Sequence, residues 1–169
     1  MGASALNLPQ SPRDAVFRAM ETIVRQNQTF QRIVKPSSFR TWQGNPEDAK
    51  EFTFEIAPAM RWTPQNTGEQ FRTPDTMSGD LLVNAEVLIK GTNVSDLQNF
   101  WWMLVKCFYP GMSPPSGQNS YQVIQTLQTA GARSGLVLFS QPAFDPGPDG
   151  VWLAGQGQIK IEIQSQLNA

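Results

Sequence analysis

The chain has 169 residues, of which 40% are hydrophobic and 16% are charged, and its formal net charge is −1. This length suits one domain with a full hydrophobic core. Charged residues usually make up about 25% of a globular chain. Uncharged polar residues must therefore cover much of this surface, which favours contact with other protein chains. The Lys and Arg residues are scattered, whereas nucleic-acid binding needs a basic stripe.

The sequence also lacks most of the side chains that enzymes use. It contains no histidine and one cysteine, Cys107. Ser–His and Cys–His nucleophiles are therefore excluded, and one thiolate cannot form a zinc site. Cys107 lies in an apolar run and is expected to be a small buried side chain. The acidic pair Glu47 and Asp48 is expected in a solvated turn. We expect no enzyme, no bound metal and no cofactor.

Neither a membrane helix nor an N-terminal secretory signal is expected. No apolar stretch reaches the ~18 residues that a membrane helix needs. Residues 1–10 lack the basic start and apolar run of a secretory signal, and they are expected to form a flexible arm. A single domain is expected over residues 11–169.

A first helix is predicted from Ser11 onward. Ser11 is a suitable N-cap, Pro12 suits the first turn, and Asp14 lies near the positive end of the helix. The helix is expected to end near residues 26–28 and to cover one face of a sheet. The apolar side chains that follow at helical spacing are Val16, Met20, Ile23 and Val24.

Short strands and a long loop are predicted next. One strand is expected at 38–42, where Phe39 and Trp42 are the side chains to bury. A second is expected at 52–56, where apolar and polar residues alternate, and residues 60–63 could continue it past a bend. Residues 64–79 are polar and contain Pro and Gly, so they are predicted to be a loop. A loop of this length is usually functional or disordered.

The clearest pattern is a strand over 81–90 followed by a helix over 94–108. Apolar residues alternate with polar ones in the strand, which is typical of a half-buried strand. Asn93 or Ser95 is expected to cap the helix. Burial of the helix's apolar stripe, at about 1.5–3 kcal/mol per side chain, is expected to stabilise the fold. The stripe comprises Leu97, Phe100, Trp101, Leu104, Val105 and Phe108.

The two adjacent tryptophans of this helix are expected to differ. Trp101 lies on the stripe and belongs to the core, whereas Trp102 is rotated by about 100° from it. An indole at this position suits a protein interface, where aromatic residues are enriched. A partly buried position at the rim of the core is the alternative. The predicted interface residues are Trp102, then Gln70, Phe71, Arg72 and Pro74 of the first long loop, and Phe144 of a second.

The second long loop is expected over residues 111–150, interrupted by a helix at 121–130 and a short strand at 136–139. A long strand is predicted at 151–166. Gly131, Gly135, Gly155 and Gly157 lack the surroundings of a phosphate-binding motif and are interpreted as bends or turns. The order of elements predicts an α+β fold, with an antiparallel or mixed sheet and two main helices packed on one face.

The order of these elements resembles the tail terminator, or tail-completion, family of tailed bacteriophages. The segment LLVNAEVLIKGTNVSDLQNFWWMLVKCFYP and the closing strand GQIKIEIQ carry the likeness in layout. The resemblance implies a subunit of a hexameric ring that ends the tail tube and joins it to the head–tail connector, both of which would be partners. DNA would pass through the pore without sequence-specific binding. It also implies assembly in the host cytoplasm and a place in the virion, away from membranes.

Two alternatives remain open. The chain could be another phage neck or tail subunit, such as a head-closure, tube or baseplate protein. It could instead be an α+β module that binds a small ligand or carbohydrate through its tryptophans. A tube protein would polymerise alone, whereas a binding module would stay monomeric and change its indole fluorescence with ligand.

Overall fold

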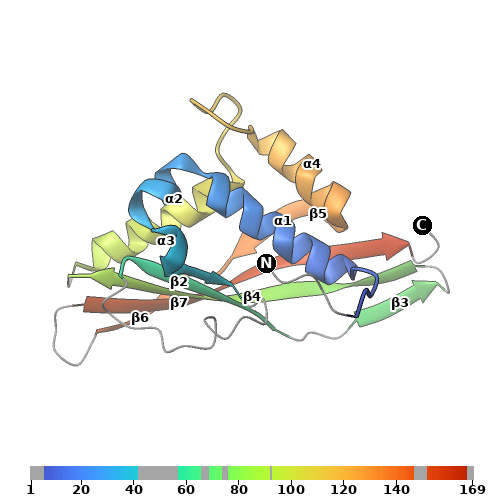
Figure 1. Ribbon diagram of the computed structural model, residues 1–169, viewed down its shortest axis with the longest axis horizontal. Helices are drawn as coiled ribbons and strands as arrows, with labels where there is room; N and C mark the ends of the chain where they lie inside the picture. The colour runs from blue at the N-terminus through green and yellow to red at the C-terminus, as the bar shows by residue number, and fades with distance from the viewer. Residues whose placement is uncertain are drawn as a thin grey trace.

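The computed structural model describes residues 6–41, 57–65, 69–73, 76–91, 93–146 and 152–166. In these ranges four α-helices lie on one face of a seven-stranded sheet (Figure 1). The predicted α+β class, with a mixed sheet and helices on one face, is confirmed. Trp42, the acidic pair Glu47 and Asp48, and the strand predicted at 52–56 lie outside the described residues.

The element bounds are as follows. The helices are α1 (Pro12–Gln26), α2 (Gln28–Ile33), α3 (Val94–Phe108) and α4 (Ser120–Ala130), and a 3-10 turn occupies Pro36–Ser38. The strands are β1 (Phe39–Thr41), β2 (Ala59–Gln65), β3 (Glu69–Thr73), β4 (Thr76–Lys90), β5 (Ala132–Phe139), β6 (Ala143–Pro146) and β7 (Trp152–Gln166).

Two long strands, β4 and β7, form the centre of the sheet. They pair antiparallel over 15 residues, from Thr76 opposite Gln166 to Lys90 opposite Trp152. Each has two shorter strands on its outer edge: β3 and β2 pair with successive parts of β4, and β5 and β6 pair with successive parts of β7. The sheet is mixed because β1 runs parallel to β2.

The two faces of the sheet differ in character. The helices cover one face (Figure 1), where alternate residues of the long strands are buried. The opposite face carries ion pairs, including Asp80 with Lys160 at 3.2 Å and Arg61 with Glu86. This alternation places the core between sheet and helices. The buried side chains of the long strands include Leu81, Val83, Ala85, Val87, Ile89, Ile159, Ile161 and Ile163.

Side-chain caps define the first two helices. The Ser11 hydroxyl accepts a hydrogen bond from the backbone N–H of Asp14 at 3.1 Å, so the predicted start of α1 is confirmed. Asn27 ends α1 and begins α2, because its side chain accepts a hydrogen bond from the backbone N–H of Phe30 at 3.0 Å. The sequence does not predict α2, because six residues are too few to show a helical period.

Residues 64–79 are wrongly predicted to be a loop. β2 continues to Gln65, β3 occupies Glu69–Thr73, and β4 already begins at Thr76. Pairing with β4 and β7 supplies the backbone hydrogen bonds of these strands, so they form without a run of alternating apolar residues. Pro64 is tolerated because it lies beyond the residues of β2 that pair with β1.

The region 111–150 is also more ordered than a long loop. α4 confirms the helix predicted at 121–130, and β5 begins at Ala132 instead of Leu136. β6 is not predicted, because its four residues lie in a Pro-, Gly- and Asp-rich segment. Gly131 ends α4 with a φ of +125° and Gly135 has a φ of +72°, which confirms their interpretation as turn or bend residues.

Gly155 and Gly157 let α3 lie close to β7. A Cβ atom added at Gly155 would come within 2.7 Å of the Leu97 side chain, and one added at Gly157 would come within 2.7 Å of Trp101 Cζ2. Both glycines stay in regular register with β4. Their interpretation as bends or turns is therefore wrong: their role is to leave room for two core side chains of the helix.

Tyr109 closes part of the outer edge of β5. Its hydroxyl donates a hydrogen bond to the backbone C=O of Val137 at 2.8 Å and accepts one from the N–H of the same residue at 2.7 Å. Backbone groups on an edge strand can otherwise pair with a strand from another chain. Tyr109 thus satisfies both groups within the subunit.

Candidate functional site

α3 turns its two tryptophans in different directions. Trp101 is 6% exposed and its ring meets the Phe139 ring edge-on, with 6.1 Å between centroids. Trp102 is 62% exposed, so most of its indole is open to contact. Large exposed aromatic side chains are enriched at protein interfaces. A contact role for Trp102 stays a prediction, now supported by its exposure.

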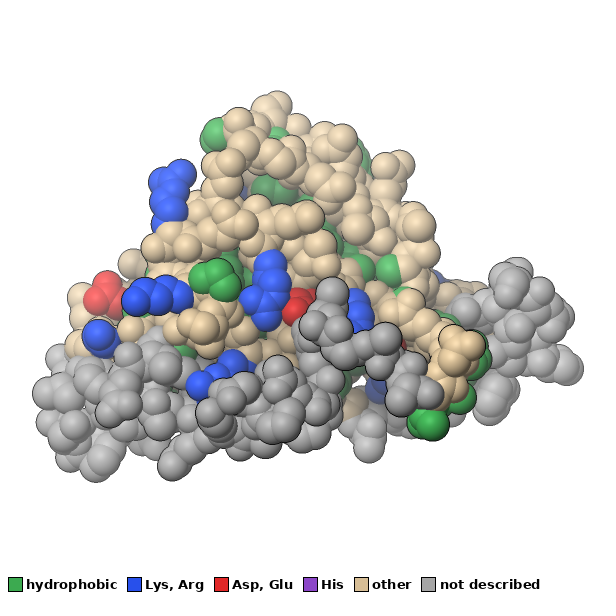
Figure 2. Space-filling model, viewed as in Figure 1, with side chains coloured by type: hydrophobic (Ala, Val, Ile, Leu, Met, Phe, Trp, Pro, Cys, Tyr) green, Lys and Arg blue, Asp and Glu red, His purple; other side chains and the backbone are tan. Residues whose placement is uncertain are grey.

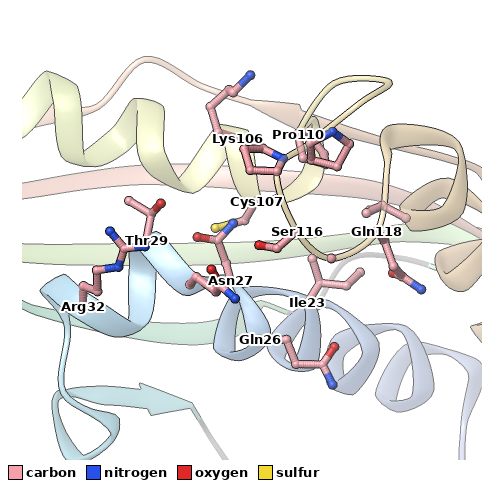
Figure 3. Close-up of a pocket in the computed structure, with 15 residues that line it drawn as sticks. Ile23, Gln26, Asn27, Thr29, Arg32, Lys106, Cys107, Pro110, Ser116 and Gln118 are labelled. Atoms are coloured by element: carbon pink, nitrogen blue, oxygen red, sulfur yellow. The ribbon is translucent and has the colours of Figure 1, made fainter.

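A groove runs beside Trp102. Its main hollow, about 350 Å³, lies between the α1–α2 junction, the end of α3 and the loop before α4 (Figure 3). A second hollow of about 290 Å³ extends to Trp102, and Asn27, Thr29 and Lys106 line both. The two hollows therefore adjoin one another, and together they form the groove. Other polar residues that line it are Gln26, Gln28, Arg32, Ser116 and Gln118.

Cys107 lies on the floor of this groove (Figure 3). Its thiol is buried and donates a hydrogen bond to the backbone C=O of Met103, with 3.4 Å between sulfur and oxygen. Burial raises the pKa of Cys107 to about 12, so the thiol is protonated at neutral pH and is a poor nucleophile. The prediction of a small buried side chain is confirmed.

A second apolar surface lies on the sheet face opposite the helices. Leu136 and Leu138 of β5 are exposed and flank Val137, which is buried on the helix side. Leu138 lies opposite Lys160 of β7, on the polar face. The ion pair between Arg133 and Glu162, at 2.8 Å, joins the same two strands. This surface is therefore separate from Trp102 and the groove.

The predicted interface residues do not form one surface. Residues 70–72 lie in β3, which pairs with the first residues of β4, whereas Phe144 lies in β6 near the opposite end of the sheet (Figure 1). Pro74 lies outside the described residues. Phe144 is 53% exposed and is paired opposite Gly155, on which α3 packs. Among the predicted interface residues that the structure describes, Phe144 and Trp102 lie toward the same end of the sheet, away from β3.

The groove itself is not predicted from the sequence. Its walls come from residues 23–32 and 106–123, which are far apart in the chain. Arg32 and Lys106 are isolated basic residues with no motif around them, and Pro114-Pro115 indicates only a loop. The groove arises when this loop folds back toward the α1–α2 junction.

The described residues offer no group of three or more Cys, Asp or Glu side chains that could hold a metal ion. None of the described helices is long and apolar enough to cross a membrane. A scan against models of protein families finds no match, and a search of curated proteins finds no similar chain.

Proposed function

We propose that the chain is a structural subunit of a ring, a hexamer, that ends a phage tail tube and joins it to the head–tail connector. The observation that carries the proposal is two unlike apolar surfaces on one subunit: Trp102 on α3, and Leu136 and Leu138 on the opposite face of the sheet. A closed ring uses heterologous contacts, in which one surface of a subunit meets a different surface of the next.

The densely packed core is consistent with a rigid subunit that keeps its shape while several partners bind. Trp62 is fully buried among the rings of Phe17, Phe39 and Phe108, at centroid distances of 6.5, 5.2 and 6.4 Å. Aromatic contacts of this kind add to the burial of apolar area. The low share of charged residues, 16%, is also favourable for extensive contact between subunits. The order of elements resembles that of the tail terminator family. This resemblance is the reason for proposing the ring that ends the tail tube.

The rival functions differ in their assemblies. A tail-tube protein would form tubes, whereas a head-closure or baseplate protein would occupy another ring. A module for small ligands would be expected to have a largely apolar pocket. The lining of the groove beside Trp102 mixes amide, hydroxyl and cationic side chains with prolines and with Ile23, Cys107 and Val123. This mixed lining is suited to a protein partner, which presents both polar and apolar groups.

The proposal is tested by the mass of the purified protein in solution, together with electron micrographs of negatively stained particles. Six copies of the 18.8 kDa chain would give about 113 kDa. Trp102→Ala and Leu138→Gln should each reduce ring formation without lowering the melting temperature, because both side chains are exposed. Tyr121→Ala is the matched control, since Tyr121 is 65% exposed and lies on neither surface.

Single rings that are lost in the two surface variants, and kept in Tyr121→Ala, would support the proposal. Tubes would favour a tail-tube protein. A chain that remains monomeric at every concentration would count against a ring subunit.

A further inference from the structure

The groove beside Trp102 has an unbalanced charge. Arg32 and Lys106 are exposed at its rim, and no Asp or Glu lines either hollow. Within the described part of the chain, neither side chain makes an ion pair. By contrast, Arg25 pairs with Glu21 at 2.9 Å and Arg133 with Glu162 at 2.8 Å. Cations without partners at the rim of a groove attract an anionic group.

This charge is a local feature, because the whole chain has a formal net charge of −1. On the side of the molecule seen in Figure 2, the described Lys and Arg side chains are more prominent than those of Asp and Glu. In Figure 3, Arg32 and Lys106 come from two different helices, α2 and α3, and stand on either side of the groove. An anionic partner could therefore contact both.

The walls of the groove suit an extended peptide. Gln26 and Gln28 present exposed amides, which both donate and accept hydrogen bonds, as a peptide backbone requires. The neighbouring wall contains Pro114-Pro115, whose φ angles are fixed. A rigid wall loses little conformational freedom when a partner binds. Trp102 at the other end offers the large apolar surface that often anchors an interface.

We propose that this groove binds an extended acidic segment of another protein, with carboxylates beside Arg32 and Lys106 and an apolar side chain on Trp102. Guanidinium and ammonium groups form charge-assisted hydrogen bonds with carboxylates. A nucleic acid fits less well, because two cations displace few counterions from a phosphate backbone. Arg32 and Lys106 take no part in the proposed ring contact, and only Trp102 is shared by the two proposals.

The test is the binding of a fluorescein-labelled peptide, three repeats of Asp-Glu-Leu, to the full chain, measured by fluorescence anisotropy. The control peptide has Asn-Gln-Leu repeats, which keep the shape and remove the charge. Arg32→Gln and Lys106→Gln should each weaken binding about three- to fivefold, as expected for exposed ion pairs. Lys35→Gln is the matched control, since Lys35 is exposed and does not line the groove.

Trp102→Ala should weaken binding of the acidic peptide, and the wild-type indole emission should shift when the peptide is added. The proposal is overturned if the acidic peptide does not saturate the protein at about 1 mM, a very weak affinity. It is also overturned if the Asn-Gln-Leu peptide binds equally well, or if Lys35→Gln weakens binding as much as Arg32→Gln. Tighter binding of an oligothymidylate, lost in the same variants, would assign the groove to phosphate instead.

Discussion

Replacing Gly157 by Ala tests the contact that places α3 on the sheet. The new Cβ atom would lie 2.7 Å from Trp101 Cζ2 and 3.2 Å from Cζ3, whereas carbon atoms in contact are usually about 3.5–4.0 Å apart. Trp101 must therefore move by roughly 1 Å, although it is buried against Phe139. Overpacking of this kind costs about 1–3 kcal/mol. Without the clash, Gly→Ala in a strand would stabilise the protein by about 0.4–1 kcal/mol. The sign of the change in the free energy of unfolding therefore shows whether the clash occurs.

The assay is the free energy of unfolding from urea titration, followed by circular dichroism. Gly155→Ala is the control, because its methyl group would meet the end of the flexible Leu97 side chain and should cost less. In a Trp101→Phe background, where the ring is smaller, Gly157→Ala should cost at least about 1 kcal/mol less than in the wild type. An equal cost in both backgrounds, or a larger cost for Gly155→Ala, would refute the packing argument.

Four further predictions concern individual side chains. Trp101→Ala should lower the free energy of unfolding by about 3–5 kcal/mol, whereas Trp102→Ala should change it by less than about 0.5 kcal/mol, both measured in urea. Tyr109→Phe should lower it by about 1 kcal/mol, because the backbone N–H and C=O of Val137 lose their partner. Cys107 should react with Ellman's reagent at pH 8 only after unfolding, because it is buried and its pKa is raised to about 12. Since this pKa lies above the usual value of 9.0, the stability that Cys107 contributes should be complete below pH 9 and be lost as the pH rises toward 12.

Each of these predictions has a clear opposite result. Similar losses of stability for the two tryptophan variants would contradict their different roles. If Tyr109→Phe leaves the free energy of unfolding unchanged, water replaces the hydroxyl group at the sheet edge. Rapid reaction of native Cys107 with Ellman's reagent would contradict its burial. As a control for the pH dependence, Cys107→Ala should lose less stability above pH 9 than the wild type does.

The sequence predicts best those elements whose apolar side chains repeat over several turns or alternate over several residues. α3 has such a stripe, and its buried side chains include Leu97, Phe100, Trp101 and Leu104 as expected. Met103 and Cys107 are buried as well, because neighbouring helices cover a wider part of α3 than the stripe suggests. Ser11 and Pro12 define the start of α1 correctly, since capping depends on local geometry.

Other features depend on contacts between distant segments. β3 has no apolar alternation, and it forms because β4 offers its backbone as a partner. The role of Gly157 follows from Trp101, which lies more than fifty positions earlier in the chain. The groove requires residues 23–32 to meet residues 106–123. Hydrophobic periodicity cannot predict such features, because no local sequence pattern encodes them.

The ring proposal is tested most directly by immunogold labelling of phage particles that contain this chain, with an antibody raised against the purified protein. Gold particles should lie at one position, where the tail tube meets the head–tail connector. Labelling along the whole tube, or at the far end of the tail, would contradict the proposal and favour a tube or baseplate protein.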